Sequence, residues 1–217
     1  MAQEKVRVNA LTLLKEDHRT VEHLFERWTM VRPEEGPAVK RRLVDDMIRE
    51  LSIHAAIEEQ AFYPAVREAL PEGDDLAEHS LDEHEEAKHL LAELEGMEPG
   101  EPEFEAKVGT LIADVREHVE EEEGQIFPRL QAALREGDLE RIGEALERAK
   151  KVAPTRPHPH APARPPLNLV ASAAAGALDR ARDEVSGRSG RSGALLIAAV
   201  TAGVVALMMW RISKRQS

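Results

Sequence analysis

The segment HAAIEEQAFYP at residues 54–64 returns 64 positions later as HVEEEEGQIFP at residues 118–128. Both copies have a histidine followed four residues later by a glutamate, and both end in an aromatic residue and a proline. Four residues on an α-helix turn through roughly 400°, so the histidine and the glutamate of each copy project from one face. Each copy can therefore offer two metal ligands from one helix: His54 with Glu58, and His118 with Glu122.

A second repeat lies outside these two segments. Residues 16–18 read Glu-Asp-His, and residues 82–84, 66 positions later, read Asp-Glu-His. The chain is thus a repeated helical hairpin, in which each hairpin carries one lone histidine and one His-x-x-x-Glu pair. Two such hairpins packed about a pseudo-twofold axis would bring four histidines and two glutamates into the centre of a bundle. That arrangement predicts a two-metal site.

The composition and the periodicity predict an all-α protein. Only 3% of the residues are aromatic, whereas strands favour aromatic and β-branched residues. From Asn9 to Lys151 apolar residues recur at helical spacing, and Pro and Gly residues within 33–37, 71–74 and 96–102 separate four long helices. Gly137-Asp138 precedes a short fifth helix. Short connections between long helices predict an up-down-up-down four-helix bundle over residues 9–151.

The side chains available to hold a metal restrict its identity. The chain has no cysteine, so thiolate zinc sites and iron–sulfur clusters are excluded. Imidazole and carboxylate together suit iron, manganese or zinc. A carboxylate can bridge two cations, and six ligands shared by two metals leave coordination positions open. The six candidate ligands are His18, His54, Glu58, His84, His118 and Glu122.

These residues and their spacing resemble the hemerythrin-like HHE cation-binding domains over residues 11–128 and on to Lys151. The resemblance implies a four-helix bundle with two non-haem iron ions joined by an oxo or hydroxo bridge, with zinc or manganese as alternatives. It places the six candidates at ligand positions, with Glu58 and Glu122 as bridging carboxylates. It also implies a small ligand such as dioxygen or peroxide. We accordingly expect a di-iron protein that serves in sensing, scavenging or iron handling.

One position departs from the oxygen-carrying members of that family. In the oxygen-carrying proteins that this chain resembles, the third helix has a His-x-x-x-His pattern, whereas here the residue four after His84 is Lys88. Reversible oxygen storage is therefore less expected than a reactive or sensing iron pair. Two alternatives stay open: a metal-stabilised helical interaction module without redox chemistry, and turnover of peroxide or ferrous iron. We interpret Tyr63 as a core residue.

The C-terminal third differs from the bundle in composition. Residues 1–150 hold 38 acidic and 19 basic side chains, a net charge of −19, which disfavours a nucleic-acid partner. Residues 152–193 read as a Pro-rich, basic linker with a possible short helix at 167–185. Residues 194–210 are uncharged and predict a transmembrane helix. With no secretory signal in the first residues, the sequence predicts a single-pass C-terminal membrane anchor and a cytoplasmic bundle, with any protein partner unknown.

Overall fold

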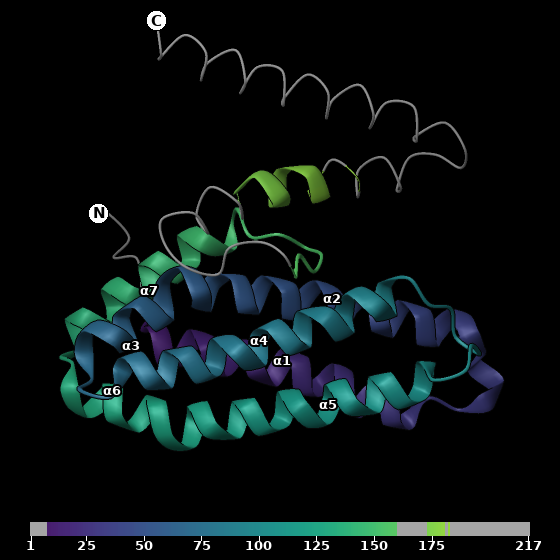
Figure 1. Cartoon of the computed structure of the whole chain (residues 1–217), viewed down its shortest axis with the longest axis horizontal. Helices are drawn as coiled ribbons and strands as arrows, with labels where there is room; N and C mark the ends of the chain where they lie inside the picture. The colour runs from purple at the N-terminus through teal and green to yellow at the C-terminus, as the bar shows by residue number, and fades with distance from the viewer. Residues whose placement is uncertain (1–7, 160–172, 181, 183–217) are drawn as a thin grey trace, which may run out of the picture. The chain divides into compact units, whose positions relative to one another are not determined.

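The computed structural model describes residues 8–159, 173–180 and 182, and in this part of the chain the regular structure is entirely helical. Four long helical rods run side by side, and a further helix packs against them (Figure 1). The elements are α1 (Ala10–Met30), η1 (Pro33–Glu35), α2 (Pro37–Ile57), η2 (Glu58–Phe62), α3 (Tyr63–Ala69), α4 (Gly73–Glu95), α5 (Phe104–Glu121), η3 (Glu122–Ile126), α6 (Phe127–Ala133) and α7 (Glu136–Lys150). Residues 173–180 are also helical, inside the range predicted for a short helix. The predicted all-α fold is confirmed.

Local sequence signals set where the rods begin. The Asn9 side chain accepts a hydrogen bond from the backbone N–H of Thr12 at 3.0 Å and so caps α1. Gly36, with φ of 77°, lies in the left-handed region that glycine adopts without strain. Pro37 follows it as the first residue of α2, a position where the missing N–H costs no helical hydrogen bond. The chain therefore turns sharply between the first and second rods.

The second and fourth rods each contain a π-helical turn. The N–H of Tyr63 bonds the carbonyl of Glu58, and the N–H of Phe127 bonds the carbonyl of Glu122, five residues back in both cases. The prolines at 64 and 128 follow directly, and proline has no N–H to offer an α-helical bond. The wider turns η2 and η3 absorb this loss. Both π turns begin at a predicted ligand.

Two apolar clusters occupy the two ends of the bundle. One cluster is built around Phe62 and Phe127, and the other around Phe25 and Phe104. Along α1, the apolar residues within 10–14 belong to the first cluster and those within 21–25 to the second, with His18 between them. Helix α4 shows the same order, and the rods that contain α2 and α5 show the reverse order, with the predicted histidine again between the two clusters. The predicted ligands therefore form a polar layer between two apolar cores.

Helix α7 covers one side of the bundle. It packs against α1, α2 and η2, and Leu139, Leu146 and Ala149 join the first apolar cluster. Gly143 allows this approach, because a Cβ there would collide with the carbonyl oxygen of Val8. Helix α7 thus covers the α1–α2 side of the bundle.

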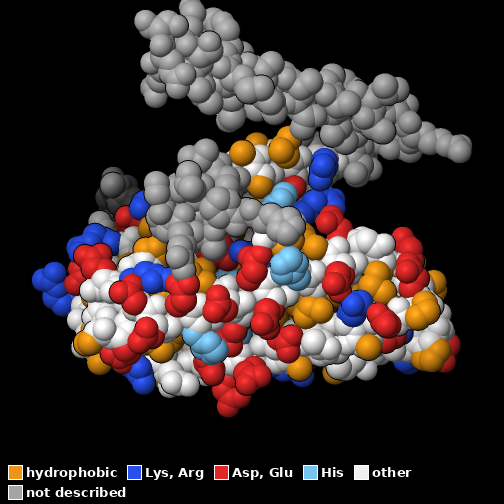
Figure 2. All heavy atoms as spheres, in the orientation of Figure 1, with side chains coloured by type: hydrophobic (Ala, Val, Ile, Leu, Met, Phe, Trp, Pro, Cys, Tyr) orange, Lys and Arg blue, Asp and Glu red, His pale blue; other side chains and the backbone are white. Residues whose placement is uncertain are grey.

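The predicted membrane location is wrong for the part of the chain that the structure describes. No helix within residues 8–159, 173–180 and 182 is both long enough and apolar enough to cross a bilayer. The long helices are amphipathic, and their outer faces carry charged side chains, many of them acidic on the face shown in Figure 2. The predicted span at 194–210 lies outside the described residues.

Candidate metal centre

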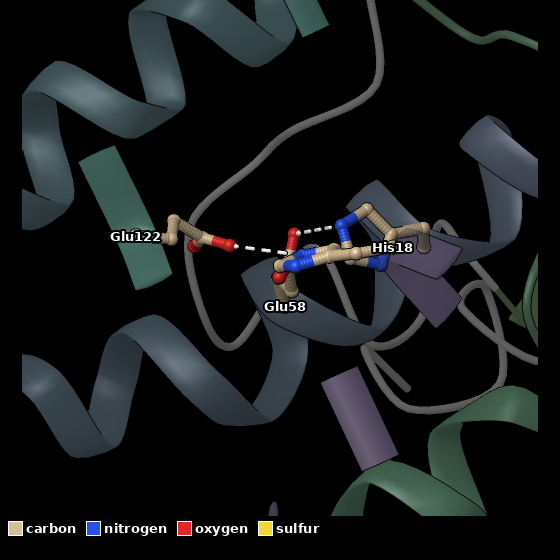
Figure 3. A group of neighbouring side chains, drawn as sticks. His18, Glu58 and Glu122 are labelled. Atoms are coloured by element: carbon tan, nitrogen blue, oxygen red, sulfur yellow. Dashed lines mark ion pairs between the residues drawn. The ribbon is translucent and has the colours of Figure 1, made fainter. Parts of the chain in front are cut away.

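The six predicted ligands converge in the polar layer. Each of the four histidines is at most 6% exposed, and Glu58 and Glu122 are fully buried. The histidines come from α1, α2, α4 and α5, and the two glutamates open the π turns η2 and η3. In Figure 3 the side chains of His18, Glu58 and Glu122, from three different rods, point toward one another.

The ligand atoms fall into two overlapping groups. His18, His54, Glu58 and Glu122 each offer one atom within 4.8 Å of the others, and Glu58, His84 and His118 form a second such group. The Nε2 atoms of His18 and His54 lie 3.3 Å from Glu122 and 3.2 Å from Glu58. The Nε2 atoms of His84 and His118 are 3.3 Å apart. Because Glu58 belongs to both groups, the two candidate metal positions share a carboxylate.

Three of the histidines are oriented by a further carboxylate behind the ring. The Nδ1 atoms of His18 and His118 lie 2.8 Å from Glu123 and Glu83. The Nδ1 atom of His84 lies 3.2 Å from Glu59. A hydrogen bond at Nδ1 leaves Nε2 free to bind a metal. Sequence reasoning assigned no role to Glu59 and Glu123, although they follow the predicted ligands Glu58 and Glu122 directly in the two copies of the repeat.

His54 is the exception among the four. Among the described residues, its buried Nδ1 has no hydrogen-bond partner. The repeat assigns it one, because Glu83, which contacts His118, corresponds to Asp17, 66 residues earlier. One Asp17 oxygen accepts a hydrogen bond from Lys150 of α7 at 2.6 Å, and the other, Oδ2, is buried without a hydrogen-bond partner. Asp17 and His54 are thus the counterparts of Glu83 and His118, which contact each other. In the described residues, Oδ2 of Asp17 and Nδ1 of His54 are both buried without a hydrogen-bond partner.

Burial and crowding perturb the titration of the centre. Burial, together with the nearby charge of Glu122, holds the pKa of Glu58 well above its usual value. Burial also opposes ionisation of Glu122, but His118, His18 and His54 outweigh it and hold the pKa of Glu122 far below its usual value. Burial lowers the pKa of His54, with the charge of His18 adding to the effect. The pKa values of the two carboxylates in this layer are thus shifted in opposite directions.

Several polar atoms of the centre are buried and have no hydrogen-bond partner within the described part of the chain. They are Nε2 of His18, Nε2 of His54, both carboxylate oxygens of Glu58 and Oε2 of Glu122. Buried polar atoms are rarely left unpaired, because removing them from water without compensation is costly. All five atoms are metal-ligand types, and the four residues that carry them each offer one ligand atom within 4.8 Å of the others. A cation pair bridged by carboxylates fits this donor set.

Tyr63 is a residue of the centre that sequence reasoning assigned to core packing. Its hydroxyl lies 3.1 Å from Nε2 of His84 and donates a hydrogen bond to Oε1 of Glu122 at 3.1 Å. Burial, with the nearby Glu122, raises the pKa of Tyr63. The repeat-related Phe127 instead stacks on His18. Comparing the two copies, tyrosine against phenylalanine, is the signal that could have revealed this asymmetry.

Lys88 lies four residues after His84, at the position where the sequence departs from the expected His-x-x-x-His spacing. Its side chain is buried, and its Nζ lies 2.6 Å from Oε1 of Glu59, the carboxylate that contacts His84. Burial raises the pKa of Glu59, but the contacts with His84 and Lys88 outweigh it and lower that pKa. A cavity of about 130 Å³ between α2, α4 and α5 is lined by Lys88 and by three of the histidines, His54, His84 and His118.

Comparison with known proteins assigns the helical domain to a family. The model of the hemerythrin HHE cation-binding domain matches residues 9–130. The chain belongs to this family. An uncharacterised hemerythrin-like protein of Schizosaccharomyces pombe is 32% identical over 143 residues, which are 65% of this chain and 70% of that protein. A DNA nickase of Nostoc is 29% identical over 147 residues, 68% of this chain but 40% of that protein.

A solved structure shares the fold of this hemerythrin-family chain. It is the crystal structure of a hemerythrin HHE cation-binding domain-containing protein from Mycobacterium kansasii, with a TM-score of 0.57 and 26% identity. The match covers 66% of this chain and 86% of the solved one. The predicted family is therefore confirmed, as is a helical domain whose clustered histidines and glutamates could bind metal cations.

Proposed function

We propose that this protein holds two non-haem iron ions and binds or reacts with dioxygen, peroxide or a similar small ligand. His18, His54 and Glu122 would hold one ion, His84 and His118 the other, and Glu58 would contact both. The observation that carries the proposal is the set of five buried nitrogen and oxygen atoms of metal-ligand type that have no hydrogen-bond partner in the described residues. Iron bound there supplies redox chemistry and open coordination positions.

The donor set favours iron over a structural zinc ion. Structural zinc sites are closed tetrahedra, mostly with thiolate ligands, whereas this centre has imidazole and carboxylate only. Two overlapping groups sharing Glu58 are typical of a dinuclear site, in which a bridging carboxylate reduces charge repulsion. The chemistry of the donors and their shared geometry thus support a di-iron centre.

The surroundings of the centre support a small oxygen ligand. The cavity of about 130 Å³ that reaches three of the histidines has room for roughly four water molecules at about 30 Å³ each. Dioxygen and peroxide are small enough to fit in this space. The hydroxyl oxygen of Tyr63 lies 3.1 Å from Oε1 of Glu122 and donates its proton to that hydrogen bond, and the Lys88–Glu59 pair fixes the ring of His84. These residues orient the centre and keep a proton beside it.

DNA nicking, named for the Nostoc relative, does not form part of the proposal. The match covers 40% of that protein. Residues 1–150 carry a net charge of −19, from 38 acidic and 19 basic side chains, and a phosphate backbone is repelled by such a charge.

Metal analysis of the purified full chain from iron-supplied cells tests the proposal. We expect about two irons per chain and near-ultraviolet absorption bands that change when peroxide is added. His54→Ala should abolish the bands and lower the iron content, whereas His89→Ala, at an exposed position on α4, should leave both unchanged. Circular dichroism verifies that both variants fold.

Two results would contradict the assignment. Iron and bands retained in His54→Ala would refute the ligand set. One zinc per chain without a redox response would instead support the metal-stabilised interaction module.

A further inference from the structure

A third group of ligand-type side chains lies on the surface beside the buried centre. Nε2 of His79 is 3.5 Å from Oε1 of Glu83 and 3.3 Å from Oε2 of Glu121. One ligand atom from each of the three residues lies within 4.8 Å of the others. His79 and Glu83 come from α4 and Glu121 from the end of α5. One imidazole and two carboxylates from two helices thus face one point in solvent.

The internal repeat shows that this group is specific to one half of the bundle. The counterparts of His79 and Glu121 are Leu13 and Ile57, which are buried in the first apolar cluster. Helix α7 covers that side by packing on α1 and α2. On the α4–α5 side the same positions are open, and both carry metal-ligand side chains.

The repeat also shows which kind of group is missing on the open side. Asp17, the counterpart of Glu83, has its Oδ1 atom bound by the ammonium group of Lys150 at 2.6 Å. Oε2 of Glu83 contacts His118 at 2.8 Å, while its Oε1 faces His79. Within the described residues, neither Glu83 nor Glu121 has a lysine or arginine partner. In the covered half, the ammonium group of Lys150 therefore lies beside the carboxylate of Asp17. In the described residues of the open half, no lysine or arginine lies beside Glu83.

We propose that His79, Glu83 and Glu121 bind a divalent metal ion from solution, at a site separate from the buried pair. Nitrogen and carboxylate oxygen ligands suit zinc, iron(II) or manganese, and three protein ligands leave the remaining positions to water. The ion occupies the place that Lys150 takes beside Asp17. Because Glu83 also contacts His118, only the Glu83 carboxylate would separate this ion from the buried centre. The proposal does not depend on oxygen chemistry at that centre.

Zinc titration of the full chain tests this site, starting from protein with its metals as purified. Calorimetry and metal analysis after gel filtration measure the zinc bound, and iron content is followed in parallel. We expect the wild type to bind one more zinc per chain than His79→Ala, or to bind it at least tenfold more tightly, since loss of a ligand costs at least as much as loss of an outer-sphere partner. His89→Ala is the matched control, because His89 is exposed on the same helix and lies 3.5 Å from Glu85. It should bind zinc like the wild type.

A second variant, His79→Lys, separates a metal site from a merely structural role. It places an ammonium group beside the two glutamates, as Lys150 does beside Asp17. We expect it to abolish the additional zinc while keeping the helical content and the thermal stability of the wild type. Equal zinc stoichiometry together with equal affinity in the wild type and His79→Ala overturns the proposal, and so does undiminished zinc binding by His79→Lys. Protein purified without buried metal would contradict the di-iron function alone, because the difference between wild type and His79→Ala is measured either way.

Discussion

The candidate ligands of the buried layer differ in their contacts, and Glu58 belongs to both groups of ligand atoms. It is fully buried and lies 3.2 Å from Nε2 of His54 and 3.4 Å from Nε2 of His84. His18, by contrast, belongs only to the group that contains His54. One side chain therefore links the two candidate metal positions, and another serves a single position.

This difference predicts unequal metal loss in two variants. Glu58→Ala removes the carboxylate common to both groups, so we expect it to leave almost no bound metal after dialysis. His18→Ala removes one ligand of the first group, so we expect it to retain about one metal per chain. Metal analysis of the dialysed proteins measures both. Equal retention in the two variants would rule out Glu58 as a shared ligand.

Asp17 is expected to fix the ring of His54 when metal is bound. Loss of such an outer-sphere carboxylate typically lowers metal affinity by about 10- to 100-fold. Asp17→Asn should therefore lower the affinity by that factor, and Lys150→Met should lower it less, because Lys150 acts only through Asp17. Competition with a chelator measures the affinity. Asp46→Asn, at an exposed position on α2, is the control, and an effect as large as that of Asp17→Asn would exclude a specific role for Asp17.

The helical elements place these side chains through two unusual features. The π turns that begin at Glu58 and Glu122 place these carboxylates in the central layer and the following aromatic rings in the first apolar cluster. Helix α7 then seals the α1–α2 side and brings Lys150 to Asp17. Local helix geometry and one added helix thus produce the asymmetry between the two halves.

The close approach of α7 gives a stability prediction with an internal control. Gly143→Ala places a methyl group against the Val8 carbonyl oxygen, and such overpacking costs typically 1–3 kcal/mol. Gly109→Ala, in the exposed interior of α5 with open space around its Cα, should instead stabilise by about 0.5–1 kcal/mol through helix propensity. Urea unfolding measures both free energies. A neutral Gly143→Ala would show that α7 does not pack as closely as the structure has it.

At the scale of the whole molecule, the bundle consists of a polar layer between two apolar clusters. The clusters contain fully buried side chains such as Phe62, Phe104, Leu14 and Met47. They bury apolar surface whether or not the polar layer holds metal. The layer itself brings four imidazoles and two carboxylates out of water, which opposes folding unless cations neutralise them.

Metal removal should therefore weaken the fold without abolishing it. A chelated sample is expected to keep its far-ultraviolet helical signal at 25 °C but to melt at a lower temperature. Metal at 100 times its dissociation constant stabilises the folded state by about 2.7 kcal/mol per independent site. Circular dichroism melts with and without chelator measure the shift. A chelated protein without helical signal would mean that the two apolar clusters do not suffice.

Much of the fold and of the candidate site could be predicted because the signals are local. Helical periodicity, the helix-breaking residues and the repeated His-x-x-x-Glu spacing depend on residues within a few turns of one another. They gave the bundle and the six residues that the structure brings together. A membrane location was predicted from an apolar run outside the described residues, and the helices that the structure describes do not support it.

The amino-acid sequence by itself determined the four-helix repeat and its inventory of histidines and glutamates, because spacing along one helix fixes which side chains share a face. The tertiary structure decided the rest. The approach of Tyr63 to His84, the ion pair of Lys88 with Glu59 and that of Lys150 with Asp17 join residues 21 to 133 positions apart in the sequence. Such contacts depend on how the rods rotate and pack against one another, which no spacing within a single helix specifies.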